Sequence, residues 1–160
     1  MKIIQDSWKQ EMLVGIDSII LKDGTLYRTE ITSSKDIIAK EAFKRSYTFR
    51  IKEKTSLKGV LSDNLDLWSE FQVRGKMDLP DNSTLLFGEC EMGNEEFIVK
   101  LDVHDNLEWS FFSTQSNPFL EARMINNEII VFSTHGFSIV LKDHFNPLSI
   151  EINNHLSLSC

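Results

Sequence analysis

The residue types that most often perform catalysis or bind metals are present, but they are not arranged in a known motif. Cys90 and Cys160 are too far apart in the sequence to form a spaced metal-binding or redox pair. Cys90 lies between Glu89 and Glu91, and neighbouring carboxylates raise the pKa of a thiol, which disfavours the nucleophilic thiolate. Two thiols without a secretory signal are typical of a reducing cytosol, so we expect a cytoplasmic protein.

Histidine-centred chemistry has one candidate. His104 lies between Asp102 and Asp105, which are metal-ligand types, but the pattern is more typical of a polar turn beside a strand. Zinc and copper sites need three or four converging ligands, and the sequence contains no Gly-rich phosphate loop, Gly-x-Ser-x-Gly or His-Glu-x-x-His. We therefore expect no catalytic residues, no metal and no cofactor. A hydrolase whose carboxylates or histidines converge in a cleft remains an alternative.

The acidic residues are the more informative set, because they are unevenly distributed. The net charge is −7, and residues 81–120 hold eight acidic residues against one basic residue, Lys100. Seven of these acids form the candidate partner-binding set: Glu89, Glu91, Glu95, Glu96, Asp102, Asp105 and Glu108. By strand alternation Glu89 and Glu91 share one face, while Glu96 and Asp102 share the outward face of the next strand. The set is either a solvated sheet face or an anionic docking surface.

The elements that must position these residues repeat along the chain. Four apolar, β-type segments are each followed by an aspartate-containing turn and a second β-type segment, and the turn residues are Asp23, Asp63, Asp105 and Asp143. The aspartates recur about every forty residues, and Asp-Gly and Asp-Asn pairs favour tight turns. The pattern predicts a mainly β protein, a single domain over 1–160, with about four strand–turn–strand repeats.

The third and fourth repeats contain further turn signals. Asp81-Asn82 and Gly93-Asn94 divide the third repeat, and Asn126-Asn127 and His135-Gly136 divide the fourth. Each of these repeats therefore predicts a four-stranded antiparallel meander. Residues 96–103 alternate with a period of two, which predicts a strand with one buried face.

One segment departs from the repeat. Residues 33–44 have the pattern of a helix, with a serine cap, an apolar face and a favourable Asp36–Lys40 pair. Residues 64–72 also have helical spacing, but the repeat favours a strand there. Asn117-Pro118 favours the start of a helical turn.

Two of the repeats share a short motif that ends in a tryptophan. The motif consists of Leu101-Asp102, Asp105-Asn106-Leu107 and Trp109 in the third repeat, and of Asp63-Asn64-Leu65 and Trp68 in the second. It resembles the blades of β-propellers of the quinoprotein or tryptophan-docking type. The resemblance implies a small propeller-like stack or a curled antiparallel meander, although 160 residues supply few blades for a ring. It implies no quinone or metal site, because the matching residues are absent.

Basic residues gather between Lys44 and Lys54, where they alternate with aromatic residues. This alternation is compatible with nucleic-acid binding, but an edge strand with outward Arg50, Lys52 and Lys54 explains it equally well. The net charge of −7 argues against a general nucleic-acid binder. The sequence has no apolar run of the roughly 18 residues that a membrane span needs.

These observations lead to the hypothesis of a non-enzymatic intracellular protein that binds a basic protein partner through an acidic face. Its most concrete version is a bacterial immunity or antitoxin-like protein that neutralises a toxin such as a nuclease. A propeller-like scaffold or assembly module is the first alternative, and the hydrolase is the second. We expect neither nucleic acid nor a membrane as a partner, and the sequence leaves the oligomeric state open.

Overall fold

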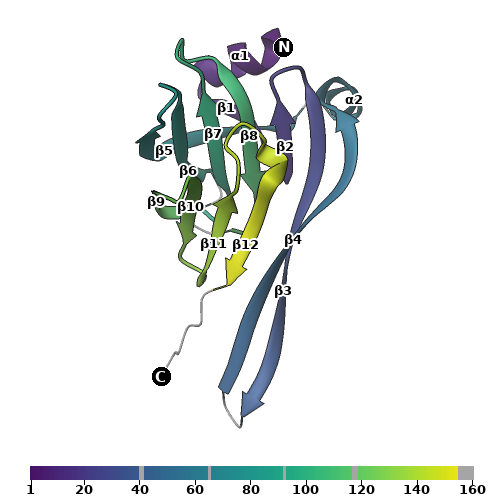
Figure 1. Cartoon of the computed structure of the whole chain (residues 1–160). Coiled ribbons are helices and arrows are strands. Elements are labelled where there is room, and N and C mark those ends of the chain that lie inside the picture. The colour runs from purple at the N-terminus through teal and green to yellow at the C-terminus, as the bar shows by residue number, and fades with distance from the viewer. Residues whose placement is uncertain (40–41, 65, 92, 117–118, 155–160) are drawn as a thin grey trace.

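The structure is a computed structural model, and it describes residues 1–39, 42–64, 66–91, 93–116 and 119–154. These residues form a mainly β protein with two antiparallel sheets and two α-helices (Figure 1). The elements, in chain order, are α1 (Lys2–Lys9), β1 (Met12–Val14), β2 (Ser18–Leu21), β3 (Thr25–Ala39), β4 (Ala42–Ser56), α2 (Leu57–Asp63), β5 (Trp68–Asp78), β6 (Thr84–Cys90), β7 (Glu96–Leu101), β8 (Leu107–Ser113), β9 (Phe119–Ile125), β10 (Glu128–Ser133), β11 (Phe137–Leu141), the 3-10 helix η1 (Pro147–Ser149) and β12 (Ile150–Asn154).

The sheet topology contains both predicted meanders. The larger sheet has the strand order β1-β5-β6-β7-β8-β2-β3-β4, so the third repeat supplies four neighbouring strands, β5 to β8. The smaller sheet has the order β12-β11-β10-β9, which is the fourth repeat. The sequence therefore predicted the pairing of consecutive strands correctly in the second half of the chain.

The predicted turns lie where the backbone needs a left-handed conformation. Asn82, between β5 and β6, has φ 67°, and Gly93, between β6 and β7, has φ 72°. Asn126 and Asn127 have φ 52° and 65°, the pattern of the two-residue turn that suits the twist of a hairpin. Asparagine and glycine adopt this conformation at low energy, which is why these turns were readable from the sequence.

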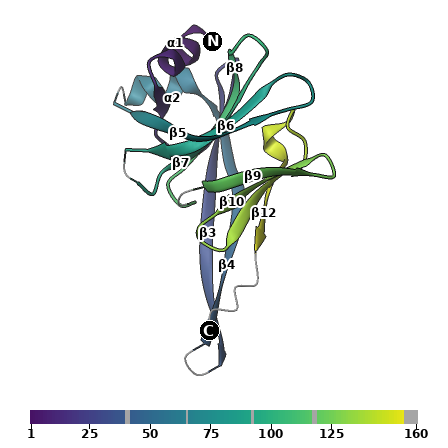
Figure 2. The same ribbon diagram turned by 90° about the vertical axis from the view of Figure 1, so that its left-hand side faces the viewer.

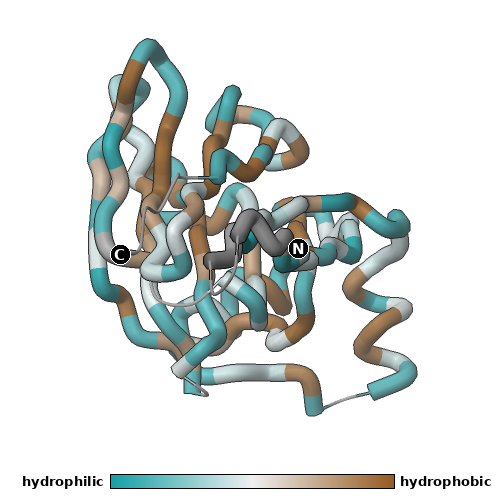
Figure 3. The backbone as a smooth tube through the Cα atoms, turned by 90° about the horizontal axis from the view of Figure 1, so that it is seen from below, coloured by the Kyte–Doolittle hydropathy of each residue, from teal (hydrophilic) through white to brown (hydrophobic). Residues whose placement is uncertain are grey.

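The core lies on both faces of the larger sheet. One face packs against the smaller sheet, where Ile98 and Phe111 meet Ile129 and Ile139. The opposite face contributes to a second apolar cluster that includes buried residues of α1 and α2, among them Ile4 and Leu57. Figure 2 shows the helices and the smaller sheet set apart from each other around the larger sheet. Figure 3 shows apolar and polar stretches alternating along the chain.

Strand β7 departs from the prediction of one buried face. All six of its residues are buried, because β7 is an inner strand of a sheet that is covered on both sides. Phe97 and Val99 belong to the cluster that also includes α1 and α2, and Ile98 belongs to the cluster between the sheets. Full burial of such side chains stabilises a fold by about 1.5–3 kcal/mol each. The same burial removes Glu96 from the outward face that alternation had assigned to it.

The helix predicted over residues 33–44 is wrong. Residues up to Ala39 continue β3, residues from Ala42 begin β4, and 40–41 lie outside the described residues. The two strands pair from Thr25↔Ser56 to Ala39↔Ala42 and extend together past the smaller sheet (Figures 1 and 2). The long ladder of hydrogen bonds outweighs a local helical preference that is worth only tenths of a kcal/mol per residue.

Helix α2 occupies a segment that the repeat had assigned to a strand. Ser56 caps it, because its Oγ accepts a hydrogen bond from the Gly59 backbone N–H at 3.0 Å. The helix buries three of its own side chains, those of Leu57, Val60 and Leu61. The repeat was correct for the following segment, since β5 begins at Trp68. It is β9, not a helical turn, that starts at Phe119, and 117–118 lie outside the described residues.

The described strands form two open sheets, and neither of them closes or curls into a ring. The first two repeats do not make separate blades, because β2, β3 and β4 continue the sheet that β5 to β8 begin. A propeller is therefore not what the structure shows. The supported description is a mainly antiparallel β protein with an eight-stranded and a four-stranded sheet.

Candidate functional site

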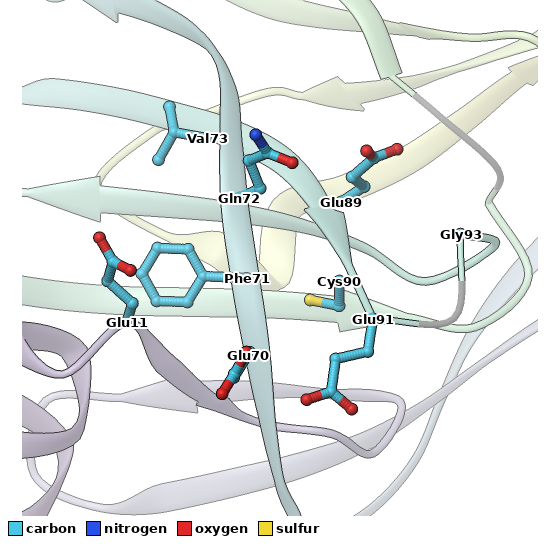
Figure 4. A pocket seen from close by; sticks show the side chains of 9 residues that line it. All are labelled: Glu11, Glu70, Phe71, Gln72, Val73, Glu89, Cys90, Glu91 and Gly93. Atoms are coloured by element: carbon cyan, nitrogen blue, oxygen red, sulfur yellow. The ribbon is translucent and has the colours of Figure 1, made fainter.

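The candidate site is a hollow of about 650 Å³ whose lining contains four glutamates (Figure 4). We call it the acidic hollow and define it by Glu11, Glu70, Phe71, Gln72, Val73, Glu89, Cys90, Glu91 and Gly93. Glu11 lies between α1 and β1, residues 70–73 lie on β5, and the remainder lie on β6 and the turn that follows it. Three segments that are distant in the sequence thus place carboxylates around one cavity.

The short strand β1 brings Glu11 to the site. β1 pairs with β5 from Met12↔Glu70 to Val14↔Trp68, and the Phe71 backbone N–H donates to the Glu11 carbonyl oxygen at 3.1 Å. Neither Glu11 nor Glu70 was predicted from the sequence as a site residue. Each is an isolated acidic residue, and the pairing of β1 with β5 has no local sequence signal.

Glu89 and Glu91 are the two predicted residues that the structure does place in the hollow. Glu91 is exposed, whereas the Glu89 side chain is 24% exposed and forms an ion pair with Arg74. The Arg74 Nε also donates to Glu89 Oε1 at 3.0 Å. Arg74 therefore offsets one of the four negative charges, and the hollow remains acidic.

Cys90 is buried in the wall of the hollow and is a thiol at neutral pH. Its pKa is raised to about 12, first by burial and then by the charges of Glu95, Glu96 and Glu91, although a hydrogen bond with Ser69 acts in the opposite direction. The direction of this pKa shift is the one predicted from the sequence, but burial is a larger cause than the neighbouring carboxylates. A protonated thiol is a poor nucleophile and a poor metal ligand.

Glu95 and Glu96 follow the hollow at the start of β7 but have different environments. Glu95 is half-buried, and the Ser69 Oγ donates to its Oε2 at 3.4 Å. Glu96 is 1% exposed, and its Oε2 accepts a hydrogen bond from the Phe119 N–H of β9 at 3.4 Å. Burial raises the pKa of Glu96 to about 8, and the charge of Glu89 acts in the same direction. Glu96 is thus an interior residue between the sheets and not part of a docking face.

The other three predicted residues lie at the opposite end of β7. Asp102 organises the β7–β8 turn, because its Oδ1 accepts hydrogen bonds from the backbone N–H groups of His104 at 2.8 Å and Asn106 at 2.9 Å. Asp105 is in the same turn with φ 62°. Glu108 pairs with the buried Lys100, with 3.1 Å between Oε2 and Nζ. The structure therefore separates the predicted residues into two groups, one at each end of β7.

Lys100 is a second interior ionisable residue that the alternation had placed on the surface. Its side chain is 1% exposed, and its Nζ lies 3.7 Å from Asp81 Oδ2 and 4.2 Å from the centre of the Phe145 ring. Two carboxylates and an aromatic face thus replace the water around the ammonium group. A lysine in the middle of an apolar run was the available sequence signal for this cluster.

The three histidines within the described residues occupy three different settings. His104 is in an exposed turn, His135 Nδ1 lies 3.1 Å from the Tyr47 hydroxyl, and His144 packs against Phe145. Burial lowers the pKa of both His135 and His144. Within the part of the chain that the structure describes, no group of three or more His, Cys, Asp or Glu side chains is arranged to hold a metal ion.

The chain has no match among protein-family models, curated proteins or solved structures. By its fold, the chain is an antiparallel β protein with two stacked sheets. Among the described helices, none is long and apolar enough to cross a membrane.

Proposed function

We propose that this chain is a non-enzymatic, cytoplasmic binding protein that holds a basic protein partner at the acidic hollow. The observation that carries the proposal is the lining of one hollow, to which three segments contribute Glu11, Glu70, Glu89 and Glu91. An arginine or lysine side chain of a partner is the complement of such a site. Complementary charge speeds association and selects partners.

The most concrete form of the proposal is a bacterial immunity protein that neutralises a basic toxin such as a nuclease. A toxin that binds nucleic acid carries a basic active surface, and an acidic protein that covers this surface blocks access to the phosphates. The net charge of −7 supports this form. So does the arrangement of the hollow, whose lining includes four acidic residues and no basic one among the described residues.

The test is affinity capture from the native host, followed by mass spectrometry and by titration with the purified captured protein. The variant carries Glu11→Lys, Glu70→Lys and Glu91→Lys, three exposed positions of the hollow where reversal preserves the core. Glu96, which belonged to the predicted set, is excluded because it is interior. The matched control carries the same charge change at Asp63, Asp66 and Glu151, which lie outside the lining.

We expect the captured protein to be basic and to bind the control variant normally. Its affinity for the hollow variant should be at least about tenfold lower, and its binding should weaken as salt increases. Equal capture by both variants would refute docking at the hollow.

A scaffold or assembly module is the second candidate, and the observation that favours it is the edge strand β4. This strand is 15 residues long and forms one border of the larger sheet. An added strand from a partner would bind through backbone hydrogen bonds. Binding of this kind would be nearly independent of salt and unaffected by the hollow variant, which distinguishes it from the first proposal. A propeller-like assembly of such sheets stays part of this second candidate.

A further inference from the structure

The end of the molecule opposite the acidic hollow presents an exposed aromatic ring. Phe145 is 68% exposed and lies in the turn after β11. Its backbone N–H donates to Asp143 Oδ1 at 3.0 Å, and one face of its ring is held 4.2 Å from Lys100 Nζ. The ring is therefore fixed in position although most of its surface is in water.

Two hollows flank this ring, and Phe145 contributes to the lining of both. One has a volume of about 490 Å³ and includes Pro80, Met124 and Asn127 in its lining. The other has a volume of about 320 Å³ and includes Leu21, Trp109 and Pro147. Both have room and apolar wall for an aromatic side chain. The same surface thus contains a projecting knob and, beside it, a hole of matching chemistry.

The charges on this surface are mixed, in contrast to those of the acidic hollow. Lys142, Asp81 and Asp143 line the larger of the two hollows, and Lys22, Asp23 and Glu108 line the smaller. Lys142 pairs with Glu128, and Asp81 and Glu108 pair with the buried Lys100, so a second copy meets this surface by placing Lys22 opposite Asp23 or Asp143. At the acidic hollow two copies would bring only like charges together.

We propose that the Phe145 surface is a two-fold interface between two copies of this chain. In a two-fold interface the same patch is used on both sides, so a knob and a neighbouring hole on one patch are what such an interface requires. Phe145 of each copy enters a flanking hollow of the other. A rigid aromatic at the centre of the contact supplies the largest share of the binding energy.

The dimer leaves the acidic hollow free. Strands β6 and β7 separate the two sites, with Glu89↔Glu96 at the hollow and Thr84↔Leu101 at the other end, a span of about 17 Å at the usual rise per residue. The dimer consequently carries two acidic hollows that lie outside the interface.

The experiment is sedimentation velocity and light scattering of the full chain over a wide range of concentration. The wild type should move from 18.5 kDa to twice that mass as concentration rises. Phe145→Ala and Phe145→Asp should weaken dimerisation by about tenfold or more, as for a central aromatic anchor. Lys22→Glu should weaken it less and mainly at low salt. Val73→Ala, which truncates another exposed apolar side chain, is the matched control and should dimerise like the wild type.

Circular dichroism and thermal unfolding establish that each variant is folded, which is expected because Phe145 is mostly exposed. A wild type that remains monomeric at the highest concentration overturns the proposal. A Phe145→Asp variant that dimerises as strongly as the wild type overturns it too, because the interface then lies elsewhere.

Discussion

Glu96 on β7 and Glu89 on β6 lie directly opposite each other in the register of the larger sheet. They share a face, yet only Glu89 reaches the acidic hollow and pairs with Arg74. Glu96 is turned into the interior and is bonded to the first residue of β9. One pair of facing glutamates therefore joins the surface site to the contact between the two sheets.

This pair predicts that the protein is less stable at alkaline pH. The pKa of Glu96 is raised from 4.5 to about 8 in the folded chain, first by burial and then by Glu89. Between these values the folded state retains a proton that the unfolded state has released, so stability is complete below 4.5 and declines as pH rises toward 8. The decline amounts to a few kcal/mol. Urea unfolding of the wild type and Glu96→Gln at pH values across this window measures it.

Glu96→Gln should flatten the pH dependence and be more stable than the wild type above pH 8. The neighbouring Glu95→Gln is the control and should keep the wild-type profile. Parallel pH profiles for the wild type and Glu96→Gln would show that Glu96 ionises normally in the folded protein.

Lys100 gives a second prediction, because removal of a buried cation leaves its carboxylates without a partner. Lys100→Met should destabilise the chain by about 2–3 kcal/mol, which is below the range for fully buried pairs. The reduction follows from Asp81 and Glu108, whose side chains are 32% and 33% exposed and can recruit water. Chemical unfolding of the single variants and the double variant Lys100→Met, Glu108→Gln gives the coupling energy.

The double variant should recover part of the loss, since the neutral amide that replaces the Glu108 carboxylate leaves no unpaired charge at that position. If the effects of the two substitutions simply add, then the ion pair does not exist in solution.

Cys90 gives the third prediction, which concerns reactivity. In a Cys160→Ser chain only Cys90 can react, and its pKa of about 12 leaves few thiolates at pH 8. A shift from 9.0 to about 12 lowers the thiolate fraction about a thousandfold, and burial restricts access as well. A disulfide reagent should label Cys90 in the folded chain at least about a hundredfold more slowly than in the chain unfolded in urea. Comparable rates in the folded and unfolded chains would mean that the thiol is exposed and ionised.

The sequence predicted those features that local chemistry determines. Asn82, Gly93 and Asn127 mark their turns because few other residues tolerate a positive φ, and the two meanders follow from these turns. The adjacent carboxylates indicated the direction of the Cys90 pKa shift, although burial, which the sequence did not reveal, is its largest cause.

The features that depend on distant segments were missed. Glu11 and Glu70 meet because β1 pairs with β5, and nothing near either residue signals that pairing. Glu96 and Lys100 alternate like surface residues, but their strand is covered on both sides. The segment 33–44 has helical spacing, yet the β3–β4 ladder determines its conformation up to Ala39 and from Ala42.

The strand order of the larger sheet has a consequence for biosynthesis. β1 and β2 are neighbours in the chain, but β5, β6, β7 and β8 lie between them in the sheet. β1 therefore has no partner strand until β5 (Trp68–Asp78) has been synthesised, and one edge of β2 stays unpaired until β8 (Leu107–Ser113) has been synthesised. Such non-local pairing makes folding slow and exposes apolar edges in the meantime. We expect the nascent chain to depend on chaperones longer than its size alone would require.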